Sequence, residues 1–266
     1  MPSIVDRVEF VTRVGGSDGE PLARGVALTV LASGDRGARG LTTALAAFSP
    51  NTELPTHVHA CGEAMVIVEG AVVVQVENRR YRLTRLDSLF VPAGVPHSVG
   101  NASSAEDAVV HVSFPSDAPD RQLVEPPTDK PEDRSAPPAG GPESIRRFAD
   151  VERYELATDA EFTDLFASRF GSSGVCGGYG RFQPGSSLPC HTHHYDESIS
   201  IIEGAAVCQV AGREHELSGC DTACVPEGAP HRFINRSDAP MAMIWVYAGD
   251  EPDREIVENA LCAAPR

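Results

Sequence analysis

The chain has 266 residues, 41% of them hydrophobic, and its 38 acidic side chains outnumber its 22 lysines and arginines, which gives a net charge of −16. This length suits two domains of ordinary size, each with its own core. No apolar run approaches the length of a membrane span. The acidic balance, with no basic cluster, argues against nucleic acid and anionic membranes as partners.

The N-terminal stretch MPSIVDRVEF lacks the charged and apolar regions of a secretory signal, so a cytoplasmic location is expected. The seven cysteines are odd in number and scattered, with no C-x2-C pair. They are therefore predicted to be small, reduced, mostly buried thiols, without a disulfide framework.

The first chemically informative stretch is His57-Val58-His59, followed by Glu63 and, forty residues after His57, by His97. In a β-strand the side chains at i and i+2 point to the same face, so both histidines of the pair can reach one ion. Glu63 adds an oxygen ligand and His97 a third imidazole. Together these four residues predict a metal site.

The same pattern recurs 134 residues later, and the repeat needs no gap from Phe48 to Ser103. Its second set of predicted ligands is His191, His193, Glu197 and His231. Chance would not align four ligands in one frame, so the chain is interpreted as a duplication.

The pattern G-x5-H-x-H-x3-E-x6-G, followed by P-x-G-x2-H-x3-N, resembles the two motifs of the cupin superfamily, and two copies resemble a bicupin. The second copy fills both motifs, from Gly185 to Asn235. The first has Asn51 in place of the first glycine, and a later turn glycine is replaced by Leu86 and Cys220 in the two copies. These departures concern turn geometry, not the metal ligands.

Short apolar, β-branched runs separated by turns, such as 64–68 and 71–77, predict an all-β protein. The resemblance implies two tandem cupin barrels, each a jelly roll or double-stranded β-helix, with a few short helices. We place the N-terminal barrel at residues 1–114, a proline-rich linker at 115–143 and the C-terminal barrel at 144–266.

Two short helices are predicted in the second half. One begins at the capping-box spacing of Thr158 to Glu161 and carries an apolar face from Phe162 to Phe170. The other covers residues 253–263 in the C-terminal tail.

Several further residues bear on the site. His194 and Asp196 flank the ligands and are expected to be solvated or supporting groups, and Cys61 to be a small turn residue. The 134-residue shift aligns His111 with Trp245 and Ser113 with Tyr247. Trp245 and Tyr247, together with Tyr179, Arg181 and Gln183 on an earlier strand, predict that the C-terminal barrel carries the principal activity.

Three imidazoles and one carboxylate suit a divalent transition metal and leave coordination positions open for a substrate. Up to two metals per chain are expected, and Fe, Mn, Ni, Zn or Cu all fit this ligand set. Glu63 and Glu197 are also the candidate catalytic bases.

The cupin resemblance implies several functions. The leading hypothesis is a metal-dependent dioxygenase-type oxidoreductase, similar to quercetinase-type bicupins, that acts on a small organic molecule, with aromatic compounds among the candidates. The alternatives are a redox-neutral cyclase or isomerase, a decarboxylase, and a non-enzymatic metal-binding or small-molecule-binding cupin. Leu54 and Leu188 stand where oxalate decarboxylases carry an arginine, which weakens that alternative. A small-molecule substrate is the expected partner, and a homodimer is compatible with the sequence.

Overall fold

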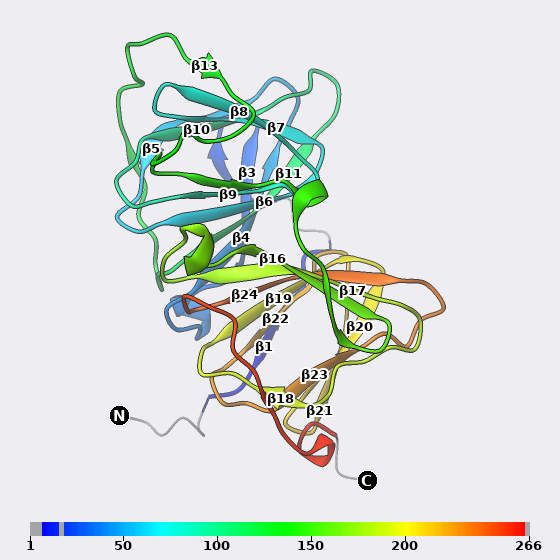
Figure 1. Ribbon diagram of the computed structural model, residues 1–266. Coiled ribbons are helices and arrows are strands. Elements are labelled where there is room, and N and C mark those ends of the chain that lie inside the picture. Colours follow the sequence, from blue (N-terminus) through cyan, green and yellow to red (C-terminus); the bar gives the residue numbers. More distant parts are fainter. Residues whose placement is uncertain (1–6, 16–18, 264–266) are drawn as a thin grey trace.

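The computed structural model describes residues 7–15 and 19–263, and its regular structure is β-strand apart from a few 3₁₀ turns (Figure 1). The predicted all-β fold with two barrels is confirmed. The 3₁₀ turns are η2 (Gly34–Arg36), η3 (Phe148–Asp150), η4 (Ser168–Phe170) and η5 (Asn259–Leu261). No helix within the described ranges is long and apolar enough to cross a membrane.

The first barrel consists of a seven-stranded and a six-stranded sheet, which enclose one apolar core. The seven-stranded sheet contains, in spatial order, β14 (Ser144–Arg146), β9 (Ser88–Val91), β6 (Glu63–Glu69), β11 (Ala108–Phe114), β4 (Thr42–Phe48), β3 (Val26–Ala32) and β2 (Glu20–Ala23). The six-stranded sheet contains β12 (Gln122–Leu123), β5 (Glu53–Val58), β10 (His97–Asn101), β7 (Ala71–Val76), β8 (Arg79–Thr84) and β13 (Glu132–Asp133).

The second barrel repeats this plan with seven and five strands. Its larger sheet contains β1 (Phe10–Thr12), β22 (Thr222–Val225), β19 (Glu197–Glu203), β24 (Met241–Tyr247), β17 (Cys176–Phe182), β16 (Ala160–Phe166) and β15 (Tyr154–Ala157). Its smaller sheet contains β21 (Arg213–Ser218), β20 (Ala205–Val210), β23 (His231–Ile234), β18 (His191–Thr192) and β25 (Glu255–Ile256).

Two short strands cross between the halves of the chain. β1, near the N-terminus, pairs with β22 of the second barrel, and β14 pairs with β9 of the first. In Figure 1 the blue strand β1 accordingly lies among the strands of the lower barrel. The expected boundaries at residues 114 and 144 therefore remain a prediction, and each barrel is completed by a strand from beyond them.

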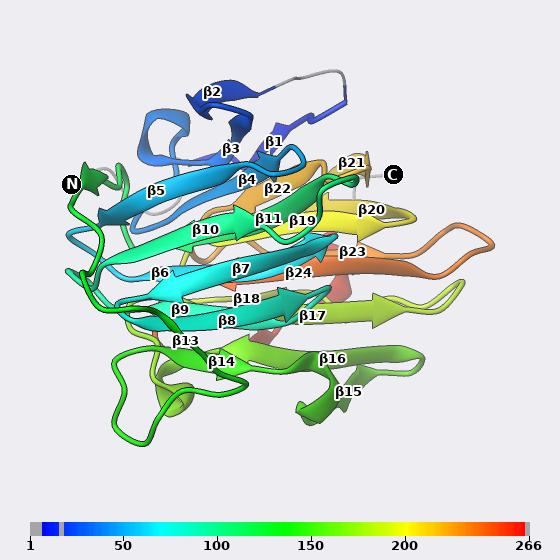
Figure 2. The same ribbon diagram turned by 90° about the horizontal axis from the view of Figure 1, so that it is seen from above.

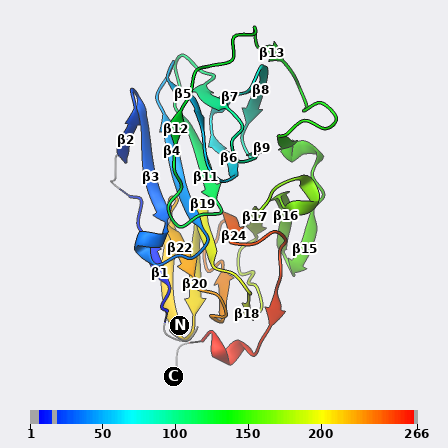
Figure 3. The ribbon, with the colours of Figure 1, turned by 90° about the vertical axis from the view of Figure 1, so that its left-hand side faces the viewer.

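The outer faces of the two seven-stranded sheets pack against each other. The first barrel accordingly lies above the second in Figures 1 and 3, and the strands of the two barrels overlap in the view from above (Figure 2). Leu45 and Val66 of the first barrel meet Tyr179 and Ile244 of the second in one buried apolar cluster. A large apolar side chain removed from water contributes roughly 1.5–3 kcal/mol. This cluster, more than any polar contact, holds the barrels together.

Both predicted helices are wrong. Residues 160–166 form strand β16, paired with β15 and β17, and only Ser168–Phe170 make a helical turn. The tail forms β25 and a 3₁₀ turn, η5. Local capping and periodicity signals favoured helices, but pairing with β15 and β17 in the first case, and with the distant strand β18 in the second, satisfies the same backbone groups.

The turns that lack the family's glycines are retained. Asn51, Leu86 and Cys220 adopt left-handed backbone conformations, with φ of 58°, 64° and 70°. A left-handed residue with a side chain costs roughly 1–2 kcal/mol. The chain accepts this cost at Leu86 and Cys220 because both turns lie next to the packed interface between the barrels.

Candidate metal centres

The first predicted ligand set forms one buried cluster. His57 lies on β5 directly across from His97 on β10, Glu63 begins β6, and His59 follows β5. One ligand atom from each residue lies within 4.8 Å of all the others. Glu63 Oε2 is 2.9 Å from His97 Nε2 and 3.2 Å from His59 Nε2.

The second set forms a matching cluster. His191 on β18 pairs across from His231 on β23, and Glu197 begins β19. Glu197 Oε2 is 2.7 Å from His231 Nε2 and 3.3 Å from His193 Nε2. All eight residues predicted from the sequence are therefore gathered in two buried groups of four.

Every cluster histidine has its Nδ1 engaged by a backbone carbonyl. In His57, His97, His191 and His231 that carbonyl belongs to the residue two positions earlier, at 2.7–2.9 Å. A carbonyl only accepts, so Nδ1 carries the proton and Nε2 keeps its lone pair for a metal. Such outer hydrogen bonds fix the tautomer and the ring orientation of metal-binding histidines.

The ionisation of the clusters also suits a cation. Burial, with the neighbouring His97, lowers the pKa of His57 to about 4, and burial lowers the pKa of His191 to about 2. Burial by itself would raise the pKa of Glu63 and Glu197, but their histidine neighbours outweigh it and lower both pKa values. At His59, burial alone would lower the pKa, but the hydrogen bond with Glu63 outweighs it and raises the pKa. Neutral His57 and His191 beside ionised carboxylates are in the protonation states that a metal requires.

The environment of His193 Nε2 shows whether the second cluster suits a bound metal. His193 Nε2 is buried and makes no hydrogen bond, although its Nδ1 donates to the Asp253 carbonyl at 2.5 Å. An unpaired buried nitrogen is costly, and a metal bound at this cluster would satisfy it. The two clusters fit divalent transition metals, up to two per chain.

A cavity of about 150 Å³ opens onto the first cluster. Its walls are mainly apolar, with Leu54, Val112 and Phe114 among them, and Asp120 and Arg121 also line it. It has room for a few atoms of a small organic ligand next to the cluster.

Two segments that the sequence analysis did not single out complete the clusters. We call residues 119–125 (PDRQLVE) the first strap and residues 252–258 (PDREIVE) the second strap. The Asp120 carbonyl accepts the Nδ1 proton of His59, as the Asp253 carbonyl does for His193. The straps repeat at an offset of 133 residues, a signal that was available but hidden in the proline-rich linker and the tail.

The straps are held as strands. β12 of the first strap pairs with β5, and β25 of the second pairs with β18, next to His57 and His191. The predicted linker is therefore extended but fixed to the first barrel at β12 and β13. Figure 3 shows the red C-terminal segment descending along the second barrel.

A disulfide joins Cys190, next to His191, to Cys262 behind the second strap. This corrects the prediction that all the cysteines are free thiols; the other five are free. The two cysteines are 72 residues apart in sequence, and only folding brings their Cα atoms to 5.9 Å. At the matching positions the first copy has Thr56 and Asp129.

The alignment of the last strands needs a correction of one residue. Ala108 pairs with Phe48 in the first barrel and Met241 pairs with Phe182 in the second, so the offset on this strand is 133. A one-residue slip reverses the face of every side chain on a strand. The partners of Trp245 and Tyr247 are thus Val112 and Phe114, whereas His111 and Ser113 face the interface between the barrels.

The barrel positions of the remaining candidates follow from the same register. Trp245 and Tyr247 belong to the interior of the second barrel, and the Tyr247 ring centroid is 4.4 Å from that of His193. Tyr179 belongs to the inter-barrel cluster, Arg181 reaches Glu203, and Gln183 is exposed. These three side chains therefore lie outside the interior of the second barrel, and they do not support the predicted activity of that barrel.

The flanking groups are supports outside the clusters. Exposed His194 pairs with Asp253 of the second strap. Buried Asp196 accepts hydrogen bonds from the Arg7 side chain and from the backbone N–H groups of Arg39 and Glu227. Cys61 is a half-buried free thiol beside the first cluster.

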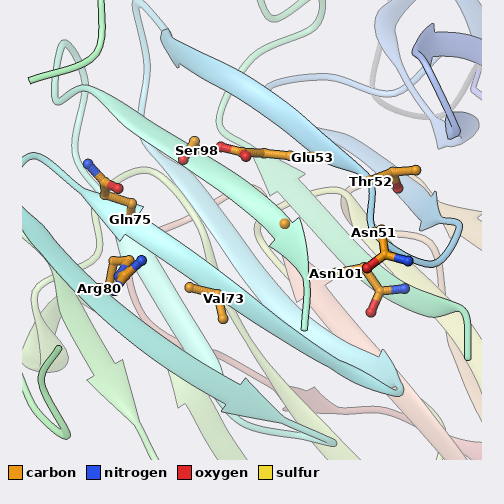
Figure 4. A pocket seen from close by; sticks show the side chains of 9 residues that line it. Asn51, Thr52, Glu53, Val73, Gln75, Arg80, Ser98 and Asn101 are labelled. Carbon is orange, nitrogen blue, oxygen red and sulfur yellow. The ribbon is translucent and has the colours of Figure 1, made fainter. Parts of the chain in front are cut away.

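A larger hollow, of about 410 Å³, lies away from both clusters (Figure 4). It is lined by residues such as Gln75, Arg80 and Ser98 on strands β7, β8 and β10. Because it contains no cluster residue, its size carries no argument about the metal chemistry.

A family model described as "Cupin domain" matches residues 44–114 and 178–247, more than half of the chain. The chain belongs to the cupin family. Each matched region spans one of the clusters, and the bicupin architecture expected from the sequence is confirmed.

Similar proteins agree with this assignment. Over 110 residues the bicupin is 29% identical to the tetracenomycin polyketide synthase protein TcmJ of Streptomyces glaucescens, a match covering 38% of this chain and 74% of the relative. A Bacillus subtilis oxalate decarboxylase OxdC structure aligns with a TM-score of 0.73 at 15% identity, covering 94% of this chain and 79% of that one. A Lactobacillus farciminis oxalate decarboxylase in a formate complex gives 0.74 at 14% identity, with coverages of 94% and 88%. At such identities these structures support the fold alone.

Proposed function

We propose that this bicupin is a metal-dependent enzyme acting on a small organic substrate that binds the metal through oxygen atoms. The observation that carries the proposal is the pairing, in each barrel, of three Nε2-presenting histidines with one ionised, buried glutamate. When bound, the metal would act as a Lewis acid and polarise the substrate's oxygens.

The chain's own residues supply the rest of the chemistry. The backbone carbonyls that engage Nδ1 hold the imidazoles in place, and the apolar walls of the first cavity exclude water. Glu63 and Glu197 are proposed to accept a proton from the bound substrate, because Glu63 lines the first cavity and Glu197 is its counterpart in the second cluster.

Two reactions are compatible with this proposal: the dioxygenase-type oxidation expected from the sequence, and a redox-neutral cyclisation. Both begin with an enolisable, oxygen-rich substrate that loses a proton. The relative named as a polyketide synthase protein supports this substrate class, since polyketides carry repeated carbonyl groups. Consumption of dioxygen separates the two reactions.

A second candidate is decarboxylation of a small carboxylate. Arg121, from the first strap, lines the cavity at the first cluster, where it can offer the cationic group that Leu54 does not. The fold shared with oxalate decarboxylases is compatible with this candidate but does not establish it.

The test is reconstitution of metal-free protein with Mn, Fe, Ni, Zn and Cu in turn, followed by incubation with a flavonol, a 1,3-diketone and oxalate. Up to two metals per chain and turnover with at least one pair are expected. Dioxygen uptake identifies the oxidation, and formate from oxalate identifies the decarboxylation. Metal binding without turnover of any of these substrates would contradict the proposal of an enzyme and would favour a non-enzymatic binding protein.

We retain the prediction that the C-terminal barrel carries the principal activity. Matched variants test it: His193→Ala should abolish turnover, and His59→Ala should leave most of it. Both variants are checked for folding and for the loss of one metal. Loss of activity confined to His59→Ala would assign the chemistry to the N-terminal barrel.

A further inference from the structure

The walls of the two centres differ at equivalent positions. Beside His59 the first barrel places Phe114, with ring centroids 5.0 Å apart, and beside His193 the second places Tyr247 at 4.4 Å. The preceding inward residue is Val112 in the first barrel and Trp245 in the second. The two centres therefore share their metal ligands, but the wall is apolar in the first and carries hydrogen-bonding groups in the second.

Two nitrogens of this second wall are buried without a partner. Trp245 is only 3% exposed, and its Nε1 makes no hydrogen bond. Its ring centroid lies 5.0 Å from that of Tyr247. The Nε atom of Arg254, on the second strap, is likewise buried and unpartnered. Leaving such donors unpaired costs roughly 1–3 kcal/mol each, unless a ligand accepts from them.

Arg254 lies against this wall. Its guanidinium carbon is 5.9 Å from the Phe162 ring centroid, and its charge helps to depress the pKa of His191. The Tyr247 hydroxyl can donate a hydrogen bond at neutral pH, because a phenol has an ordinary pKa of about 10.

The equivalent arginine of the first strap is placed differently. Arg121 is exposed, and its Nη2 donates at 3.4 Å to the Leu22 carbonyl. Phe114 and Val112, which occupy the equivalent positions at the first centre, have no hydrogen-bond donor in their side chains.

From these contacts we propose that the second centre is specific for an anionic oxygen ligand, a carboxylate or enolate. The indole N–H of Trp245, the hydroxyl of Tyr247 and the guanidinium of Arg254 bind its oxygens. This inference rests on the proposed function, because it names the substrate class of the same metal site.

Trp245 is the only tryptophan in the chain, so its fluorescence reports on the second centre alone. Zinc-loaded protein is titrated with malonate, and with malonamide as the uncharged control of the same shape. Malonate is expected to change the tryptophan emission saturably, and malonamide is expected to have no effect at the same concentrations. Equal responses to both compounds would overturn the proposal.

Variants assign the donors. Arg254→Gln should weaken malonate binding about 10- to 100-fold, the range for losing a charged hydrogen-bond donor, and Tyr247→Phe should weaken it several-fold. Arg254→Lys should retain part of the affinity, and Arg121→Gln is the matched control that should retain all of it. Equal losses in Arg121→Gln and Arg254→Gln, or no loss in either, would refute the assignment.

Elemental analysis of every sample distinguishes a failure of the proposed metal-dependent function from a failure of the proposed anion site. Protein that never holds metal contradicts the proposed function. Protein that holds zinc but shows no malonate response at Trp245 contradicts only the anion site.

Discussion

Removing the Cys190–Cys262 disulfide should destabilise the chain substantially, with a selective effect on the second metal centre. The bond closes a loop of 72 residues, and the chain-entropy relation gives about 4 kcal/mol for a loop of that length. For a chain of this size, a change of 1 kcal/mol shifts Tm by roughly 2–4 °C, so a fall of roughly 8–16 °C is expected.

The assay compares thermal unfolding of wild-type protein with that of the Cys190→Ala/Cys262→Ala double variant, each with and without reductant. Reductant should lower the wild-type Tm to that of the double variant and leave the double variant unchanged. Cys61→Ser, which alters a half-buried free thiol, is the matched control.

The disulfide should also affect metal binding at the second centre, because it anchors the second strap. The second strap supplies the Asp253 carbonyl to His193, and the disulfide joins Cys262, just beyond that strap, to the strand that bears His191. Reduction should therefore weaken metal binding at the second centre and spare the first. In denaturant, five thiols should react before reduction and seven after it. Seven reactive thiols before reduction, or equal metal loss at both centres, would refute this reasoning.

Three further outcomes are expected. Glu197→Gln and Glu63→Gln should retain metal yet lower turnover by about 10²–10⁴-fold at the centre that carries the chemistry, and unchanged turnover in both would exclude a proton-transfer role. Gly178→Ala should destabilise the protein by about 1–3 kcal/mol in denaturant unfolding, because its Cβ would overlap the backbone carbonyl oxygen of Thr163 and lie 2.5 Å from the Trp245 ring; an unchanged midpoint would show that both the strand backbone and the ring can move. Burial lowers the pKa of His111 to about 4 from 6.5, so the unfolded state takes up the proton first and stability is lost as pH falls from about 6.5 to 4. In unfolding measurements as a function of pH, His111→Asn should reduce the loss of stability between about pH 6.5 and 4. His194→Asn, which alters an exposed side chain, should leave that loss unchanged.

The sequence by itself determined the duplication, the β-class and all eight metal-cluster residues. Spacing was sufficient because a His-x-His pair on a strand presents both rings to one face, and because the repeat placed a second, independent copy in the same frame. The family's turn glycines proved dispensable, since Leu86 adopts the left-handed conformation within packed surroundings.

Only the tertiary structure decided what surrounds the clusters. Residues 160–166 form a strand because the neighbouring strands β15 and β17 satisfy its backbone groups, and residues 255–256 because β18, much earlier in the chain, does so. Local capping signals do not register either pairing. A one-residue difference before the last strand moved His111 to the interface and Trp245 to the barrel interior, since strand faces alternate with a period of two. The straps repeat in the sequence, but their contacts with His59 and His193, like the Cys190–Cys262 bond, join segments about 60 to 70 residues apart, so only the structure shows what they contact.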